Sequence, residues 1–167
     1  GSIFGVEAKG VTFDYPKAHE HKNNVMDKMR DGIAGLMKKY KVDVVEGEAK
    51  LLPNSQVEIN RETHEAIDIL LCTGSSPAIP PIPGVELDHV VDSTGILERE
   101  SLPNHLVVVG GGVIGCEFAC MHASVGVPVT VLEAMPEICP NLDAEVSESL
   151  REGLTKKGVT FKLGAKV

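Results

Sequence analysis

The chain lacks several features that would place a protein in a specialised structural class. It contains no tryptophan, and aromatic residues make up only 4% of it. No apolar run reaches the ~18 residues that a membrane helix needs, so we expect no membrane segment. There is no internal repeat and no low-complexity tract, while hydrophobic residues at 43% and charged residues at 24% are ordinary for a globular protein. These features exclude disorder, collagen and coiled coil as the main description of the chain.

An excess of basic residues is also missing. Acidic residues outnumber basic ones by 24 to 16, and the net charge of −8 argues against a nucleic acid or an anionic membrane surface as a partner. The first residues do not form a signal peptide, and Gly1-Ser2 is typical of a cloning scar. So abrupt a start leaves open whether the native N-terminus lies upstream.

Cysteines are few, and their spacing carries no metal or disulfide signature. The four are Cys72, Cys116, Cys120 and Cys139; none forms a CxxC pair, and none has zinc-ligand spacing with a histidine. We therefore predict no metal site. Cys116 and Cys120 lie four residues apart on a predicted helix, where parallel side chains make poor disulfide geometry, so we interpret both as packing residues. This usage indicates a reducing compartment, which is the cytoplasm or, in a eukaryote, the mitochondrial matrix.

A proline-rich segment predicts two parts. Residues 75–84 contain four prolines and cannot be helix or central strand, which favours a division into 1–75 and 76–167. The first part shows an amphipathic helix from Pro16 to Tyr40 and then alternating or apolar runs typical of strands. The expected strands are 42–46, 56–59 after a turn at Pro53-Asn54, and a buried strand at 67–72.

The second part alternates strands with helices. Apolar runs predict strands at 106–109, 127–132 and 159–163, and helical periodicity predicts helices at 112–126 and 143–157. Strand-helix-strand-helix-strand is the nucleotide-binding half of a Rossmann-like α/β fold. The residues expected on the apolar faces of the two helices are Ile114, Phe118, Met121 and Val125, followed by Val146, Leu150 and Leu154.

The strongest motif joins the first of these strands to its helix. Gly110-Gly111-Gly112-Val113-Ile114-Gly115 satisfies GxGxxG, with its glycines at 110, 112 and 115. The first glycine permits a tight turn, the second lets a pyrophosphate approach the backbone, and the third lets the helix pack closely on the strand. The helix N-terminus then offers free N–H groups and partial positive charge to phosphates.

An acidic residue stands where a dinucleotide site requires one. Glu133 follows the second strand, 23 positions after Gly110, near the ~20 expected. Its carboxylate would accept hydrogen bonds from ribose hydroxyls and repel a 2′-phosphate, which favours NAD over NADP. The alternative is a glycine turn followed by a chance glutamate.

A longer succession of residues resembles a known family. It comprises Cys72-Thr73-Gly74-Ser75, the prolines up to Pro83-Gly84, Asp92-Ser93-Thr94-Gly95, the stretch from Leu106 to Phe118, and Val129-Thr130-Val131-Leu132-Glu133. Together these look like the dihydrolipoamide dehydrogenases, a family of flavoprotein pyridine-nucleotide disulfide oxidoreductases. The likeness runs from about Asp14 to Val167 and implies a partial FAD-binding domain followed by a partial NAD-binding domain.

The resemblance also implies roles for individual residues. Ala49, Thr73, Gly74 and Ser75 match positions that contact FAD in the family. The glycine loop and its helix match the NAD loop, Glu133 the ribose contact, and Val167 a residue that lines the adenine pocket. Glu117 matches a position near the meeting point of flavin and nicotinamide. The full set expected at NAD is Gly110, Gly111, Gly112, Val113, Ile114, Gly115, Cys116, Glu117, Glu133 and Val167.

Other family features are missing from the sequence. The FAD glycine loop, the CxxxxC redox pair and the C-terminal domain with its His-Glu dyad are absent. We therefore expect an internal segment, inactive alone, of a homodimeric enzyme that oxidises the lipoyl domain of a 2-oxo acid dehydrogenase complex and reduces NAD. The alternatives are another NADH-using flavin disulfide reductase and a non-catalytic nucleotide-binding module.

Overall fold

A computed structural model describes residues 10–167, so the interpretation of Gly1-Ser2 lies outside the described residues. The chain separates into two compact units. The first unit is Glu20–Ser76, and the second unit joins Pro77–Val167 to the described residues up to His19. Within residues 10–167, no helix has both the length and the apolar character that crossing a membrane requires.

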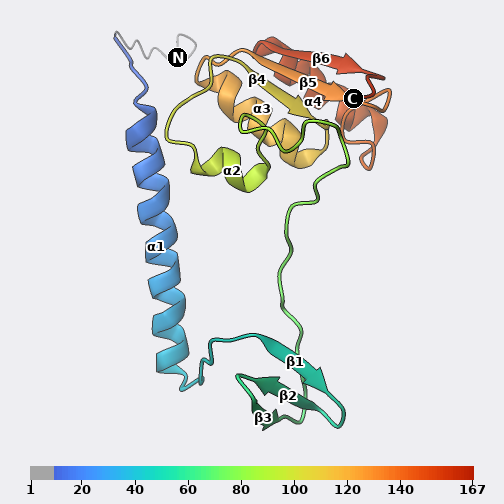
Figure 1. Ribbon diagram of the computed structural model, residues 1–167. Helices are drawn as coiled ribbons and strands as arrows, with labels where there is room; N and C mark the ends of the chain where they lie inside the picture. Colours follow the sequence, from blue (N-terminus) through green and yellow to red (C-terminus); the bar gives the residue numbers. More distant parts are fainter. Residues whose placement is uncertain (1–9) are drawn as a thin grey trace. The chain divides into compact units, whose positions relative to one another are not determined.

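A three-stranded parallel sheet organises the second unit. β4 (Leu106–Val109), β5 (Val129–Glu133) and β6 (Val159–Leu163) follow one another in the order β4-β5-β6. α3 (Val113–Ser124) and α4 (Ala144–Lys156) make the two crossovers. Right-handed crossovers in this order put both helices on the same face of the sheet, as Figure 1 shows. The predicted βαβαβ unit is confirmed.

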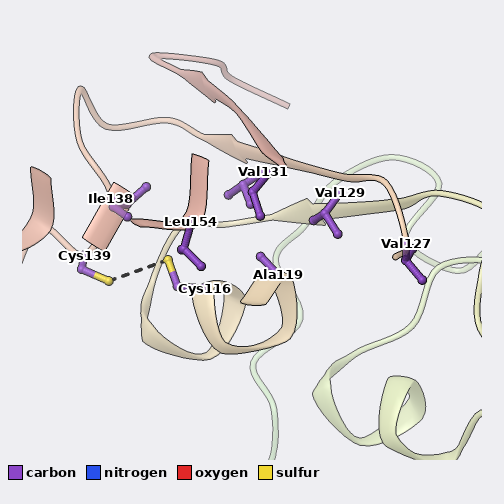
Figure 2. Close-up of a cluster of buried hydrophobic side chains, with 9 residues drawn as sticks. Cys116, Ala119, Val127, Val129, Val131, Ile138, Cys139 and Leu154 are labelled. Atoms are coloured by element: carbon purple, nitrogen blue, oxygen red, sulfur yellow. Dashed lines mark hydrogen bonds between the residues drawn. The ribbon is translucent and has the colours of Figure 1, made fainter. Parts of the chain in front are cut away.

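The core of this unit lies between the sheet and its two helices. Val129 and Val131 point from β5 toward α3, where Ala119 is fully buried, and Leu154 closes the layer from α4 (Figure 2). The other face of the sheet is open, because Val107 and Val109 of β4 are more than half exposed. The carboxyl ends of the strands carry the connections that build the site described below.

The predicted apolar face of α3 is only partly correct, because Val125 packs against the core but Ile114 and Met121 do not. Ile114 is 59% exposed and Met121 40% exposed, whereas Cys116, Ala119 and His122 are buried. In its first two turns the helix places the small side chains of Cys116 and Ala119 toward the sheet, because the glycine loop brings this end of α3 close to β4. Two of the three apolar residues expected to face inward on α4 are also partly exposed, Val146 at 52% and Leu150 at 36%, while Leu154 is buried as predicted.

A short helix also precedes the sheet. α2 (Ser93–Glu98) begins at Asp92, whose carboxylate accepts hydrogen bonds from the N–H groups of Thr94 and Gly95. Sequence patterns had assigned no helix here. Its Ile96 is buried, which ties α2 into the second unit.

The first unit contains a small antiparallel sheet and, from Glu20 onward, most of one long helix. α1 (Tyr15–Lys39) agrees with the predicted helix and contains no buried residue. β1 (Ala49–Leu52), β2 (Gln56–Ile59) and β3 (Glu62–Glu65) pair in the order β1-β2-β3. The turn at Pro53-Asn54 is confirmed, and β3 is an addition that the alternation pattern did not indicate.

Two predicted strands of this unit are wrong. Residues 42–46 and 67–72 are assigned to no strand, and the apolar side chains of the second segment are exposed, with Ile67 at 96% and Leu70 at 87%. A β-strand needs a partner for its N–H and C=O groups. Within residues 10–167 neither segment has one, so apolar composition alone does not make it a strand.

Candidate functional site

The glycine loop turns tightly between β4 and α3. Gly110 has φ +106°, a conformation that other residues rarely adopt, and its N–H donates to the carbonyl of Leu132 at 2.8 Å. A Cβ on Gly115 would collide with the carbonyl oxygen of Gly110 and lie 3.1 Å from Val108 Cγ1. The first and third glycines of the motif are therefore needed for the turn and for close packing, as predicted from the sequence.

The N-terminus of α3 is open to a ligand. Gly112 is the N-cap residue, no side chain caps the helix, and a Cβ built on Gly112 meets no atom within 4 Å. Val113 and Ile114 in the first turn are 58% and 59% exposed. Free N–H groups, partial positive charge and space beside Gly112 are the donor set that a pyrophosphate requires.

The carboxylate of Glu133 lies against this loop. Its Oε2 accepts the N–H of Gly111 at 2.6 Å, and its Oε1 accepts the N–H of Met135 at 2.7 Å. The side chain comes from the end of β5 and is only 9% exposed. Each carboxylate oxygen keeps further lone-pair capacity, so two ribose hydroxyls can still be accepted. The structure thus brings together the loop and the acidic residue that the sequence placed 23 positions apart.

Two cysteines meet beneath the loop. Cys116 on α3 and Cys139 in the connection after β5 are both buried, with their sulfur atoms 4.0 Å apart (Figure 2). Burial, together with the neighbouring Cys139 and Glu133, raises the pKa of the Cys116 thiol to about 12. Cys116 is a packing residue, as expected, but its sulfur partner is Cys139 rather than Cys120.

The remaining residues expected at NAD lie around the same edge of the sheet. Glu117 is exposed on α3. Val167 is 60% exposed and follows Ala165, whose N–H donates to the backbone carbonyl of Glu133 at 2.9 Å. The segment after β6 is therefore bound back to the end of β5, close in the chain to Val167.

The residues expected at FAD lie in the first unit. Ala49 begins β1, and Thr73, Gly74 and Ser75 belong to the extended segment before the prolines. All four are exposed, and Gly74 has φ +72° with open space around its Cβ position. The exposure of these four residues contrasts with the side chain of Glu133, which is only 9% exposed.

Sequence patterns placed Gly111 in the NAD loop but did not indicate its tight packing, and they missed Cys139. Gly111 occupies a variable position of GxGxxG, yet a Cβ there would lie 2.9 Å from Ile138 Cγ2 and 3.2 Å from Glu133 Oε2. The available signal for this tight fit was that Gly111 is the middle one of three consecutive glycines. Cys139 had no signal, because its proximity to Cys116 depends on the tertiary fold.

Comparisons with known proteins agree with this geometry. The family model described as "Pyridine nucleotide-disulphide oxidoreductase" matches residues 5–167. Proteins named dihydrolipoyl dehydrogenase from Chlamydia pneumoniae and Bacillus subtilis are each 39% identical over 98% of this chain. The chain covers 36% and 37% of their lengths, a little over a third.

Solved structures give the same result for the fold. The HOCl-induced flavoprotein disulfide reductase RclA from Escherichia coli has a TM-score of 0.81 and 33% identity, covering 93% of this chain and 36% of its own. LpdA from Mycobacterium tuberculosis has a TM-score of 0.79 and 25% identity, covering 99% of this chain and 38% of its own. The arrangement of strands, loop and helices is thus one that flavoprotein disulfide reductases share.

Proposed function

The chain belongs to the pyridine nucleotide-disulphide oxidoreductase family, and on that premise we propose that it is part of a dihydrolipoyl dehydrogenase that binds FAD and NAD. The parent enzyme would oxidise dihydrolipoamide and pass a hydride to NAD. This chain would supply the first half of the NAD-binding domain, from residue 76, and part of the FAD-binding domain up to residue 75.

The observation that carries the proposal is the contact between Glu133 and the glycine loop. The uncapped N-terminus of α3 can bind the pyrophosphate, while the Glu133 carboxylate, 2.6 Å from Gly111 N, can accept the ribose hydroxyls. A 2′-phosphate would meet this carboxylate at close range, so the site selects NAD. Val167 would border the adenine, and Glu117 would lie toward the nicotinamide.

The flavin contribution is a smaller part of the proposal. Thr73, Gly74 and Ser75 would contact FAD where the chain leaves the flavin domain, and Ala49 would lie beside its adenine. Their exposure is consistent with a surface that contacts a ligand without enclosing it. Bound FAD would relay electrons from a dithiol to NAD, while the protein supplies binding and orientation. Because the sequence has no CxxxxC pair, we expect the chain alone to be inactive.

Partners and location follow from the same proposal. The parent would act on the lipoyl domain of a 2-oxo acid dehydrogenase complex as a homodimer. All four cysteines are free, including the pair with sulfur atoms 4.0 Å apart, which fits a reducing compartment such as the cytoplasm.

A second candidate is another flavin disulfide reductase with a different disulfide substrate. The likeness to the E. coli reductase, with a TM-score of 0.81, favours it to a similar degree. Both candidates use the same nucleotide site. Assaying the whole protein with lipoamide against other small disulfides, with NADH as the reductant, separates the two.

The nucleotide site itself is tested by titrating NAD and NADP against the wild-type chain and Glu133 variants. Charge-assisted hydrogen bonds contribute roughly 1.5–3 kcal/mol each. Because water recovers part of the loss, Glu133→Ala should weaken NAD binding by about ten- to a hundredfold. Glu133→Arg should go further and favour NADP, because a guanidinium pairs well with phosphate.

Two controls separate ribose binding from damage to the loop. Glu145→Ala removes an exposed carboxylate from α4 and should leave NAD affinity unchanged. Glu133→Gln keeps one carbonyl acceptor and should lose less affinity than Glu133→Ala. Unchanged NAD affinity in a folded Glu133→Ala chain would remove Glu133 from the site.

A further inference from the structure

Three groups converge on the carbonyl oxygen of Gly111. The N–H of Cys139 donates to it at 2.9 Å, and the sulfur atoms of Cys116 and Cys139 lie 3.4 and 3.6 Å away. Gly111 is itself buried, so water does not compete for this oxygen. The carbonyl of Gly111, in the second position of the glycine loop, is thus bound by Cys116 and Cys139, which are 23 positions apart in the chain.

The protons of the two thiols can be assigned without conflict. Each thiol has one proton, and a carbonyl oxygen has two lone pairs. The N–H of Cys139 and the thiol of Cys116 occupy the Gly111 oxygen, which leaves the Cys139 thiol to donate to the Cys116 sulfur at 4.0 Å (Figure 2). Every donor in the group then has an acceptor.

The same glycine residue faces Glu133 with its N–H. That N–H donates to Glu133 Oε2 at 2.6 Å, a short charge-assisted bond. Gly111 has no side chain to hold it, and its neighbour Gly110 lies in the left-handed region. The conformation of this loop therefore depends on what its peptide groups bind. The Cys116 thiol and the Cys139 N–H bind the carbonyl of Gly111, while the Glu133 carboxylate binds its N–H.

We propose that Cys116 and Cys139 are positioning residues of the dinucleotide site, which hold Gly111 so that its N–H stays on Glu133 and the carboxylate stays aimed at the ribose. The inference rests on the proposed NAD site. Neither thiol touches the ribose; both act through Gly111 and Glu133.

The surroundings of Cys116 keep its thiol protonated, as this role requires. A thiol can donate only while it is protonated, and burial raises the pKa of Cys116 to about 12. Adjacent packing is tight, since Ile138 is fully buried and approaches the Cβ position of Gly111 to 2.9 Å. The Cys116 thiol is therefore a protonated donor across the physiological pH range.

A double-mutant cycle in the 167-residue chain tests this role. NAD affinity is measured for the wild type, Cys139→Ala, Glu133→Ala and the double variant, with a second cycle for Cys116→Ala. In the wild-type background each cysteine change should weaken NAD binding by about threefold to tenfold. In the Glu133→Ala background the same change should have almost no effect, because the carboxylate that the thiols position is absent.

Three comparisons make the result specific. Cys116→Ser restores a donor of similar shape and should recover much of the lost affinity. Cys120→Ala, one turn further along α3 and without a contact to Gly111, should leave NAD affinity unchanged. The amide proton of Gly111, followed by NMR without any nucleotide, should move upfield and exchange faster in Cys139→Ala and Cys116→Ala.

The outcomes distinguish the inference from the proposed function. Failure of the wild-type chain to bind NAD would remove the proposed site, whereas the Gly111 amide signal would still report whether the thiols hold the loop. Equal losses of affinity in both Glu133 backgrounds, or a Gly111 amide unchanged in the alanine variants, would overturn the positioning role alone. Coupled losses with rescue by serine would support it.

Discussion

The two units of the chain differ most in what their strands are packed against. Between Glu20 and Ser76 no residue is buried, and β1, β2 and β3 are held by antiparallel pairing between neighbours in sequence. In Pro77–Val167 the parallel strands β4, β5 and β6 are joined through helices that cover their inner face. This difference indicates that an antiparallel hairpin can form from local pairing, whereas a parallel sheet forms together with its core.

This difference bears on where a binding site can be built. A dinucleotide site needs a loop and a carboxylate held in fixed geometry. In the second unit Glu133 is nearly buried and bonded to two N–H groups, while the residues expected at FAD in the first unit are all exposed. The comparison therefore predicts a preformed NAD site and, for the chain alone, no stable binding of flavin.

Hydrogen exchange should show the largest contrast between the units. Amides of β4 and β5 should exchange at least ~1000-fold more slowly than those of residues 42–72, because buried strands open only with the whole unit. The measurement is amide exchange followed by NMR or mass spectrometry at neutral pH. Uniformly high protection across residues 42–72 would contradict the comparison.

An aspartate introduced in a strand should strongly destabilise the second unit but have only a small effect on the stability of the first. Val131→Asp places an unpaired carboxylate at a position with no solvent exposure and should destabilise the second unit by more than ~3 kcal/mol. The matched change Val57→Asp, at a partly exposed position of β2, should cost less than ~1 kcal/mol. Urea unfolding followed by circular dichroism and NMR measures both, and similar losses would refute the contrast.

Two glycines of one loop should separate folding from binding. Gly115→Ala forces a methyl group against the Gly110 carbonyl and should destabilise the unit by ~1–3 kcal/mol. Gly112→Ala adds a methyl group in open space, so its effect on stability should stay below ~1 kcal/mol while NAD binding falls sharply. Thermal unfolding and NAD titration of both variants provide the test, and an intact NAD affinity in Gly112→Ala would exclude pyrophosphate binding there.

Alkaline pH should produce the smallest effect, confined to the second unit. The pKa of the Cys116 thiol rises from 9.0 to about 12 on folding, so the unfolded chain releases this proton first. The resulting stability is complete below pH 9 and is lost progressively as pH rises toward 12. Because lysines and tyrosines also titrate there, the quantity to measure is the difference in pH slope between wild type and Cys116→Ala. Equal slopes would contradict the prediction.

Most of the second unit could be predicted because its signals are local. The turn at Gly110 and the end of α4 both require positive φ, and glycine stands at each, with φ +106° at Gly110 and +94° at Gly158. Apolar runs and helical periodicity then place the strands and helices between these turns. The spacing from Gly110 to Glu133 equals the length of one strand-helix-strand unit after its first strand, so the main elements of the candidate site could be predicted from the sequence.

The sequence by itself determined the order of the elements, the glycine loop and the position of Glu133, since each depends on residue type within a short window. Only the tertiary structure decided which face of α3 is buried, that Cys139 meets Cys116, and that residues 67–72 are exposed. These depend on contacts between distant segments. Gly115 allows the start of α3 to approach β4 closely, so small side chains face the sheet there. The connection after β5 places Cys139 next to Gly111, with its N–H bonded to the Gly111 carbonyl. An apolar run becomes a buried strand only where another strand and a helix cover it.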